Sequence, residues 1–223
     1  MCTAECFRWV GQRVRRGDVE NKRILEVGSY DVNGSLRYVF EMLEPAEYIG
    51  TDIEKGPCVD VVCGAENLVS HFGENSFDIV VSASALEHIR DWRTSISNIK
   101  RVCRPGGLIF FLVPFQWVYH AHPGDYWRYS PEDIRTIFSE FTIENIEVDP
   151  HPPSLVYARL RKPLGDFKEV DLSNVALHSM VSGTRVIDIS DKDFQSAHFR
   201  KTVLKYKMKN LGLKLGKRIF RQL

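Results

Sequence analysis

Apolar segments of strand length alternate with helical patterns from residue 23 to residue 162. The runs that predict buried strands cover residues 23–28, 47–53, 58–63, 76–84 and 108–115. Apolar residues at spacings of three and four predict a helix with one buried face over 89–102, and similar spacing predicts a helix over 35–43. Strands that alternate with helices in this way predict an open α/β sheet with helices on both faces.

The last predicted elements close this sheet. The run 108–115 is apolar throughout and follows the helix-stopping sequence "RPGG", which predicts a central parallel strand that begins after the glycines. Ser130, Pro131 and Asp133 fit the N-cap, the first turn and the third position of a capping box, so we expect a helix to begin there. Segments 141–148 and 154–162 alternate between apolar and polar residues and predict an antiparallel pair.

Two regions follow from this pattern. Residues 1–163 are predicted to form one domain, which includes an N-terminal helix. Residues 164–223 begin with a polar and poorly periodic stretch. We expect this second region to be an irregular extension that ends in a basic amphipathic tail.

The composition is that of a soluble globular protein, with 43% apolar and 26% charged residues. No apolar run approaches the roughly 20 residues that cross a bilayer, and the N-terminal segment lacks the apolar core of a secretory signal. The five cysteines are scattered and form no CxxC pattern, which argues against a zinc ribbon and a disulfide framework. We therefore expect a cytoplasmic protein with free thiols.

The net charge of +1 hides an uneven distribution. Residues 196–223 contain nine basic residues and no acidic one, so the rest of the chain holds 21 basic against 29 acidic residues, a net charge of −8. A basic amphipathic helix can lie on an anionic membrane, bind nucleic acid or cover the acidic body of its own domain. The sequence leaves these three uses of the tail open.

The segment "ILEVGSYDVNGSLR" (24–37) predicts a strand, a glycine loop and a helix. Gly28 and Gly34 fit tight turns, but the other glycines of the dinucleotide pattern G-x-G-x-x-G are missing, and Tyr30 would crowd a diphosphate. Glu26 is an acid at the strand end, which disfavours a polyphosphate and suits an ammonium group. Asp52 ends the next strand, where a carboxylate typically binds both hydroxyls of a ribose. A ligand with a ribose, a cationic end and no phosphate fits S-adenosylmethionine better than NAD.

Four segments in order resemble the motifs of class I S-adenosylmethionine-dependent methyltransferases. They are "ILEVGSYDVNG", "YIGTDIEKGPCVDVV", "FDIVVSASALEHIRDW" and "VCRPGGLIFFLVP". The resemblance covers about residues 20–162 and is greatest to the methyltransferase type 11-like group with its "LEH" and "RPGG" signatures. It implies a Rossmann-like, mostly parallel seven-stranded sheet with an antiparallel last strand. It also implies methyltransferase activity (EC 2.1.1.-), with S-adenosylmethionine as cofactor and S-adenosylhomocysteine as product.

The resemblance also implies roles for individual residues. Glu26 would face the methionine amino group, Asp52 would bind the ribose, and Ser82 would lie beside the methionine carboxylate or amine. The other residues implied in cofactor binding are Gly28, Ser29, Tyr30 and Gly34 in the loop, Ile53 against the adenine, and Ala65 and Glu66 in the stretch that usually contacts the adenine. Gly64 departs from the family because an adenine-binding aspartate is common at that position.

The segment "HAHPGDYWRYSPED" (120–133) carries the catalytic candidates. An imidazole titrates near neutral pH, so His120 or His122 is expected to be the general base, with Asp125 orienting it. Arg128 is expected to hold an anionic or hydroxyl-rich acceptor, Trp127 to stack on a ring of the acceptor, and His88 to border the acceptor pocket. The alternative is that the aromatic residues of this segment form a hydrophobic lid.

A metal site is the alternative use of the same histidines, because Glu87 and His88 follow the fourth predicted strand. Some small-RNA 3′-end methyltransferases hold a metal with the pattern ExxEH and a later histidine. Here Ser84 occupies the first position of that pattern, so we expect no metal. We expect Glu87 and His88 instead to cap the following helix.

Three hypotheses for function remain from the sequence. The first is O-methylation of a sugar, a glycan or another small molecule, and similar "DYWRY" segments occur in enzymes of sugar and polysaccharide modification within the resembled group. The second is an RNA-directed methyltransferase that uses the basic tail. The third is a non-catalytic Rossmann-like binding module. The sequence leaves the oligomeric state undetermined.

Overall fold

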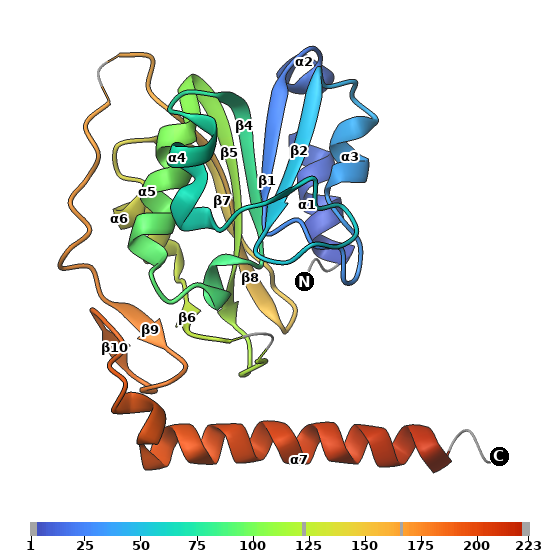
Figure 1. The fold of residues 1–223 in the computed structure, drawn as a ribbon, viewed down its shortest axis with the longest axis vertical. Helices are drawn as coiled ribbons and strands as arrows, with labels where there is room; N and C mark the ends of the chain where they lie inside the picture. Colours follow the sequence, from blue (N-terminus) through green and yellow to red (C-terminus); the bar gives the residue numbers. More distant parts are fainter. Residues whose placement is uncertain (1–3, 122–123, 166, 220–223) are drawn as a thin grey trace.

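The computed structural model describes residues 4–121, 124–165 and 167–219, and the side chains of the last helix through Leu211. Its main feature is a seven-stranded sheet in the order β3-β2-β1-β4-β5-β8-β7 (Figure 1). The strands are β1 (Arg23–Val27), β2 (Glu47–Asp52), β3 (Val61–Val62), β4 (Phe77–Ala83), β5 (Cys103–Gln116), β7 (Thr142–Val148) and β8 (Ser154–Arg161). Strand β8 runs antiparallel to both of its neighbours, and the pairs formed by β1 to β5 are parallel. The predicted Rossmann-like sheet with an antiparallel last strand is confirmed.

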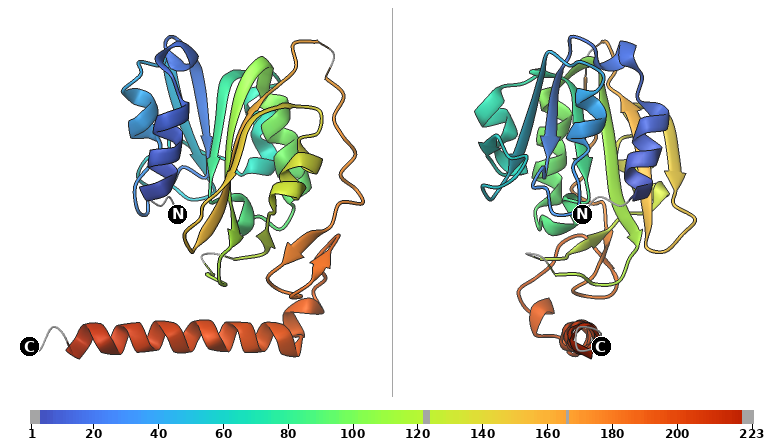
Figure 2. Two further views of the ribbon diagram at one scale, coloured as in Figure 1. Left: turned by 180° about the vertical axis from the view of Figure 1, so that it is seen from behind. Right: turned by 90° about the vertical axis from the view of Figure 1, so that its right-hand side faces the viewer.

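Helices cover both faces of the sheet (Figure 2). The α-helices are α1 (Ala4–Arg13), α2 (Arg16–Val19), α3 (Arg37–Glu41), α4 (Leu68–Phe72), α5 (Trp92–Val102), α6 (Pro131–Ile137) and α7 (Ala197–Ile219), and the 3-10 turns are η1 (Ala65–Asn67), η2 (Leu86–His88) and η3 (Asp193–Gln195). Trp9 of α1 and Phe40 of α3 belong to the core on one face. Trp92 of α5 and Ile134 of α6 belong to the core on the other face. The apolar spacing predicted for each helix therefore reflects burial against the sheet.

The capping signals of the sequence hold in α6. Ser130 Oγ accepts a hydrogen bond from the Asp133 N–H at 3.1 Å, and Asp133 Oδ2 accepts one from the Ser130 N–H at 2.8 Å. Together these bonds satisfy two of the backbone donors that a helix start leaves free. Asp91, rather than Glu87 or His88, caps α5 by accepting a bond from the Thr94 N–H. The capping role expected of Glu87 and His88 is therefore wrong.

Two strand boundaries differ from the prediction. Strand β5 begins at Cys103, because Cys103 pairs with Phe77 before residues 104–107 bulge out and Leu108 pairs with Ile79. Gly106, at φ +73°, makes that bulge. Strand β3 has only two residues. Just before it begins, the side chain of Asp60 accepts a hydrogen bond from the Gly50 N–H at 2.7 Å, and a backbone carbonyl of β3 would accept that bond if the strand began earlier.

The region after residue 163 is more regular than its sequence indicates. Strand β9 (Leu177–Ser179) pairs with β10 (Arg185–Val186) on one side and with β6 (Trp127–Arg128) on the other, which forms a second, three-stranded sheet. Strand β6 lies in the loop after β5. Leu177 and Val181 are fully buried in the main core cluster. The guanidinium of Arg93, on α5, donates to the carbonyls of Leu172, Val175 and Ile187. The expectation of an irregular extension is thus wrong for residues 172–189, and the domain boundary at residue 163 stays a prediction.

Helix α7 lies on the side of the domain that holds the loops after β4 and β5 (Figure 1). Its first turns contact the domain through aromatic rings, since Phe199 and Tyr206 each meet the ring of Tyr119. As far as Leu211, no lysine or arginine of α7 pairs with a carboxylate of the described residues. These contacts do not favour the basic tail as a cover for the acidic body. Among the described residues, no helix is both long enough and apolar enough to span a membrane.

Truncation of Leu177 tests whether the second sheet is part of the folded core. The variant Leu177→Ala removes a fully buried side chain and should lower the free energy of unfolding by about 2–5 kcal/mol in urea denaturation. The control Leu164→Ala truncates a side chain that is 85% exposed and should change the same free energy by less than about 0.5 kcal/mol. Equal stability of the two variants would show that the extension does not fold with the domain.

Candidate functional site

The candidate site lies at the carboxyl ends of the central strands, where the strand order reverses between β1 and β4. Gly28 follows β1 with φ +78°, and the backbone N–H groups of Gly28 and Ser29 donate to the Thr51 carbonyl at 2.8 and 2.9 Å. A Cβ atom at residue 28 would lie 2.3 Å from the Cβ of Ala85, in the turn after β4. Only glycine allows this approach, which brings the loops after β1 and β4 into contact.

Glu26 is buried at the end of β1 and has two hydroxyl partners. Its Oε2 accepts hydrogen bonds from Tyr48 Oη at 2.9 Å and from Ser35 Oγ at 3.2 Å. Burial raises the pKa of the Glu26 carboxyl to about 7, and the two hydrogen bonds only partly offset that effect. A group at this pKa ionises readily when a cation arrives, so Glu26 suits an ammonium group.

Two hollows open beside this loop. Glu26, Gly28, Ser29, Tyr30 and Gly34 line the smaller one together with Ala83. The larger one has a volume of about 380 Å³ and is lined by Ile53, Gly64, Glu66 and Asn67 among others. Asp52 connects them, because it precedes Ile53 in the chain and its Oδ2 accepts a hydrogen bond from the Tyr30 N–H at 3.4 Å.

The residues that line these hollows suit the parts of S-adenosylmethionine, although the smaller hollow has a volume of only about 20 Å³ and must widen to admit the methionine end. The smaller hollow holds the acid suited to an ammonium group, Asp52 lies where a ribose would reach, and the larger hollow has room for a base. Ser29 Oγ and Ser82 Oγ are buried and have no hydrogen-bond partner among the described residues. Buried hydroxyls without partners are costly, which is consistent with a ligand that supplies them.

Seven of the ten predicted cofactor residues line the two hollows, whereas Asp52, Ala65 and Ser82 do not. Ala65 is buried in the hydrophobic core and does not line the larger hollow, although its neighbours Gly64 and Glu66 do. The expected contact of residue 65 with an adenine stays a prediction. Gly34, at φ +109°, sits against the ring of Phe7, and its N–H donates to Asp31 Oδ1 at 2.6 Å, which fixes the turn into α3.

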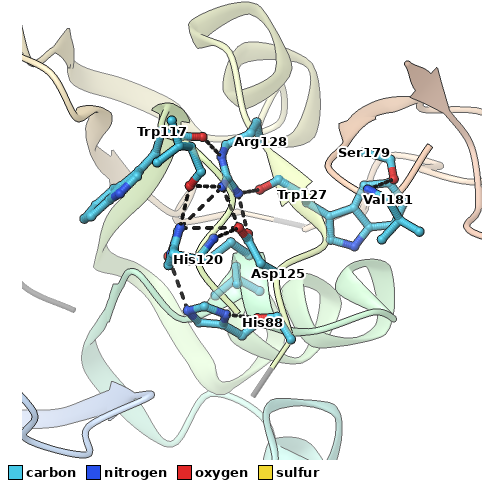
Figure 3. A network of polar contacts seen from close by, with 12 residues as sticks. His88, Trp117, His120, Asp125, Trp127, Arg128, Ser179 and Val181 are labelled. Carbon is cyan, nitrogen blue, oxygen red and sulfur yellow. Dashed lines mark hydrogen bonds and ion pairs between the residues drawn. The ribbon is translucent and has the colours of Figure 1, made fainter. Parts of the chain in front are cut away.

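His120, Asp125 and Arg128 form one buried network in the loop after β5 (Figure 3). Asp125 Oδ2 accepts from the His120 backbone N–H at 2.8 Å and lies 3.3 Å from His120 Nδ1. Arg128 donates to both oxygens of Asp125 at 2.5 and 2.7 Å, and to the carbonyls of Trp117, Val118 and Trp127. Asp125 therefore positions His120, and Arg128 holds both in place.

The same network corrects two expected roles. Arg128 is only 4% exposed and its guanidinium is fully engaged within the loop, so it is not available to hold an acceptor. Trp127 is only 1% exposed and its Nε1 donates to the Arg90 carbonyl, so it cannot stack on an acceptor. His122, the other candidate base, lies outside the described residues.

Glu87, His88 and His120 form a second cluster that the sequence signal indicated only weakly. Nε2 of His88 and Nε2 of His120 each lie 3.8 Å from Glu87 Oε1. Glu87 is fully buried, which opposes ionisation, but the two imidazoles outweigh this and lower the pKa of its carboxyl to about 2. Burial lowers the pKa of the His120 imidazole, but Glu87 and Asp125 overcome that effect and raise it above its usual value. The cluster can accept a proton or bind a cation.

Comparison with known proteins finds one matching family model and several relatives that match part of the chain. The family model described as "Methyltransferase domain" matches residues 25–111. The phthiotriol/phenolphthiotriol dimycocerosates methyltransferase of Mycobacterium tuberculosis (strain ATCC 25618 / H37Rv) is 34% identical over 102 residues, which are 40% of this chain and 37% of that protein. Methyltransferase 1 of the same name from Mycobacterium ulcerans is 32% identical over 106 residues, 42% of this chain and 38% of that protein. The chain thus matches little more than a third of these relatives' length.

Solved structures share the fold at low identity. A 1,6-didemethyltoxoflavin-N1-methyltransferase of Burkholderia thailandensis, solved with S-adenosylhomocysteine, has a TM-score of 0.53 and 16% identity, over 70% of this chain and 78% of that one. An S-adenosylmethionine-dependent methyltransferase of Mesorhizobium loti has a TM-score of 0.51 and 17% identity, over 72% and 98%. The cyclase SpnF has a TM-score of 0.54 and 15% identity, over 72% and 81%. These likenesses establish the fold alone.

Because the pKa of Glu26 is raised in the folded protein, its free energy of unfolding should decrease as the pH rises. The folded protein favours the neutral carboxyl, so between about pH 4.5 and about pH 7 the folded state binds more protons than the unfolded state. The stability of the wild type relative to Glu26→Gln should therefore fall by about 3 kcal/mol as the pH rises through this window. Chemical denaturation of both proteins, free of cofactor, measures the difference at each pH. A difference that stays constant from pH 4.5 to pH 7 would contradict the assigned pKa.

Proposed function

We propose that this chain, which carries a class I S-adenosylmethionine-dependent methyltransferase domain, transfers a methyl group from S-adenosylmethionine to a hydroxyl group of a small molecule. The observation that carries the proposal is the contact between Gly28 and Ala85. It joins the hollow suited to the methionine end of the cofactor to the turn that bears Glu87 and His88. The reacting groups would then meet at the end of β4.

Residues of the two hollows would bind the cofactor. Glu26 would be ionised when it pairs with the amino group of the cofactor. The buried hydroxyls of Ser29 and Ser82 would form hydrogen bonds with the amino-acid end of the cofactor. Asp52 would accept hydrogen bonds from the ribose hydroxyls, while Ile53 and Glu66 border the adenine. Bound S-adenosylmethionine supplies a methyl group on a positively charged sulfur.

His120 is the residue that would promote loss of the acceptor's proton. Its Nδ1 faces the Val118 carbonyl at 3.0 Å and the Asp125 carboxylate, so that nitrogen carries the hydrogen and Nε2 is free to act. Asp125 and Arg128 keep the ring in this orientation, and the Trp117 ring stacks on it at 4.8 Å. An imidazole placed this way favours a hydroxyl acceptor, because a hydroxyl must lose its proton as the new bond forms.

The acceptor class follows from this chemistry. A hydroxyl of a sugar, a glycan or another small molecule meets the requirement, and the curated relatives are named for methyl transfer to phthiotriol and phenolphthiotriol dimycocerosates. RNA is the second candidate, favoured by the exposed basic side chains of α7, which are Arg200, Lys201, Lys205, Lys207 and Lys209. In the sequence, residues 196–223 contain nine basic residues and no acidic one. A module that binds the cofactor without transfer is the third reading.

Two paired substitutions test the proposal by calorimetry and labelled methyl transfer. Asp52→Ala removes hydrogen bonds to a charged group worth about 1.5–3 kcal/mol and should weaken S-adenosylmethionine binding by about 10–100-fold. His120→Asn should leave that affinity unchanged and lower the rate of transfer by about 100–10,000-fold. The controls Glu54→Ala and His151→Asn change an exposed acid two residues after Asp52 and an exposed histidine of the β7–β8 loop, and should leave both quantities unchanged.

The panel of acceptors contains hydroxylated sugars, glycans, hydroxylated lipids and RNA. Failure of the wild type to bind S-adenosylmethionine would overturn the proposal. Transfer to RNA alone, lost at high salt and on deletion of residues 196–223, would replace the first candidate with the second.

A further inference from the structure

Three potential metal-ligand atoms converge at the end of β4. They are a carboxylate oxygen of Glu87 and one ring nitrogen each of His88 and His120, and all lie within 4.8 Å of one another. We propose that Glu87, His88 and His120 bind a divalent transition-metal ion, which holds the acceptor's hydroxyl group. The identity of the acceptor position rests on the proposed function, whereas the metal site itself does not.

The Glu87 carboxylate is the first reason. Its side chain is fully buried, and neither oxygen accepts a hydrogen bond among the described residues. A buried carboxylate without donors is strongly disfavoured unless a cation neutralises it. The nearest cationic candidates are the two imidazoles at 3.8 Å, which is beyond hydrogen-bonding distance. The carboxylate therefore points into a space that a cation would complete.

The orientation of both imidazoles is the second reason. Nδ1 of His88 forms a hydrogen bond with the Gly124 carbonyl, and Nδ1 of His120 forms one with the Val118 carbonyl. A carbonyl can only accept a hydrogen bond, so each Nδ1 carries a hydrogen, and each Nε2 can offer its lone pair to a metal ion once its own proton has left. Metal-binding histidines typically have their other nitrogen bonded to a carbonyl or carboxylate in this way.

The spacing is close to that of an occupied site. Two ligands at about 2.0–2.1 Å from a tetrahedral metal are roughly 3.4 Å apart. The observed distance between Glu87 Oε1 and each Nε2 is 3.8 Å, and all three ligand atoms lie within 4.8 Å of one another, so the side chains would have to close around the ion. Behind His120, Asp125 and Arg128 form a rigid support, which explains why the loop contains a fully buried ion pair (Figure 3).

The donor set identifies the class of metal. Two imidazole nitrogens and one carboxylate oxygen favour Zn²⁺, Fe²⁺ or Mn²⁺ over Mg²⁺ and Ca²⁺, which prefer oxygen ligands. Three protein ligands leave a position for a hydroxyl oxygen, whose pKa the metal lowers. In the transfer, the hydroxyl proton leaves to solvent, the oxygen forms a bond to the methyl carbon, and the carbon–sulfur bond breaks with its electron pair remaining on sulfur. His120 then acts as a ligand in place of direct proton uptake by its Nε2.

Metal binding to the full chain, without a polyhistidine tag and after treatment with a chelator, tests the site. The wild type and the exposed-histidine control His151→Asn should each bind one equivalent of Zn²⁺. His120→Asn and Glu87→Gln should bind it about 100-fold more weakly or worse, and Asp125→Asn, which removes only support, about 10–100-fold more weakly. Circular dichroism and thermal unfolding check that each variant is folded.

X-ray absorption at the zinc edge needs only the wild type and should count two imidazole ligands. No Zn²⁺ bound to the wild type, fewer than two imidazoles, or unchanged affinity in folded His120→Asn would each overturn the inference. Calorimetry with S-adenosylmethionine tests the proposed function independently of the metal site. Cofactor binding and undiminished transfer by the metal-free protein would overturn the role of the metal in holding the hydroxyl group. Metal binding without cofactor binding would overturn the proposed function alone.

Discussion

The close approach of Gly28 to Ala85 determines how the rest of the site is arranged. A side chain of any size at residue 28 would collide with the Cβ of Ala85, so the loop after β1 and the turn after β4 can touch only through glycine. The loop lines the hollow suited to the methionine end of the cofactor, and the turn leads directly into Glu87 and His88. One backbone contact therefore brings together the residues that would bind the donor and those that would bind the acceptor.

Two buried glutamates on either side of this contact have opposite pKa shifts. Glu26 has two hydroxyl partners, and burial raises the pKa of its carboxyl to about 7 despite these hydrogen bonds and the charge of Arg37. Glu87 is buried even more completely, but two imidazoles lower the pKa of its carboxyl to about 2. Carboxylates whose environments separate their pKa values in this way commonly have different tasks in one site. Glu26 suits the ammonium group of a cofactor, whereas Glu87 lies beside the imidazoles of His88 and His120.

The sequence predicts the parts of this structure that depend on local pattern. The alternation of strands and helices, the capping box at Ser130 and Asp133, and the turn at Gly28 are all visible in short stretches of residues. The second sheet is not, because β6 and β9 are two and three residues long and pair across about 50 positions of a polar sequence. The role of Arg128 was mistaken for a similar reason. An arginine in a loop rich in aromatic residues resembles a ligand-binding group, and only the fold reveals that Asp125 and three carbonyls surround it.

The most direct test of this account is a crystal structure of the protein with S-adenosylhomocysteine. The account predicts the amino group beside Glu26, the ribose on Asp52 and the adenine in the hollow lined by Ile53 and Glu66. It also predicts that the sulfur lies next to the turn at Ala85 and faces the space between His88 and His120. A ligand bound outside these hollows, or a sulfur directed away from His120, would contradict it.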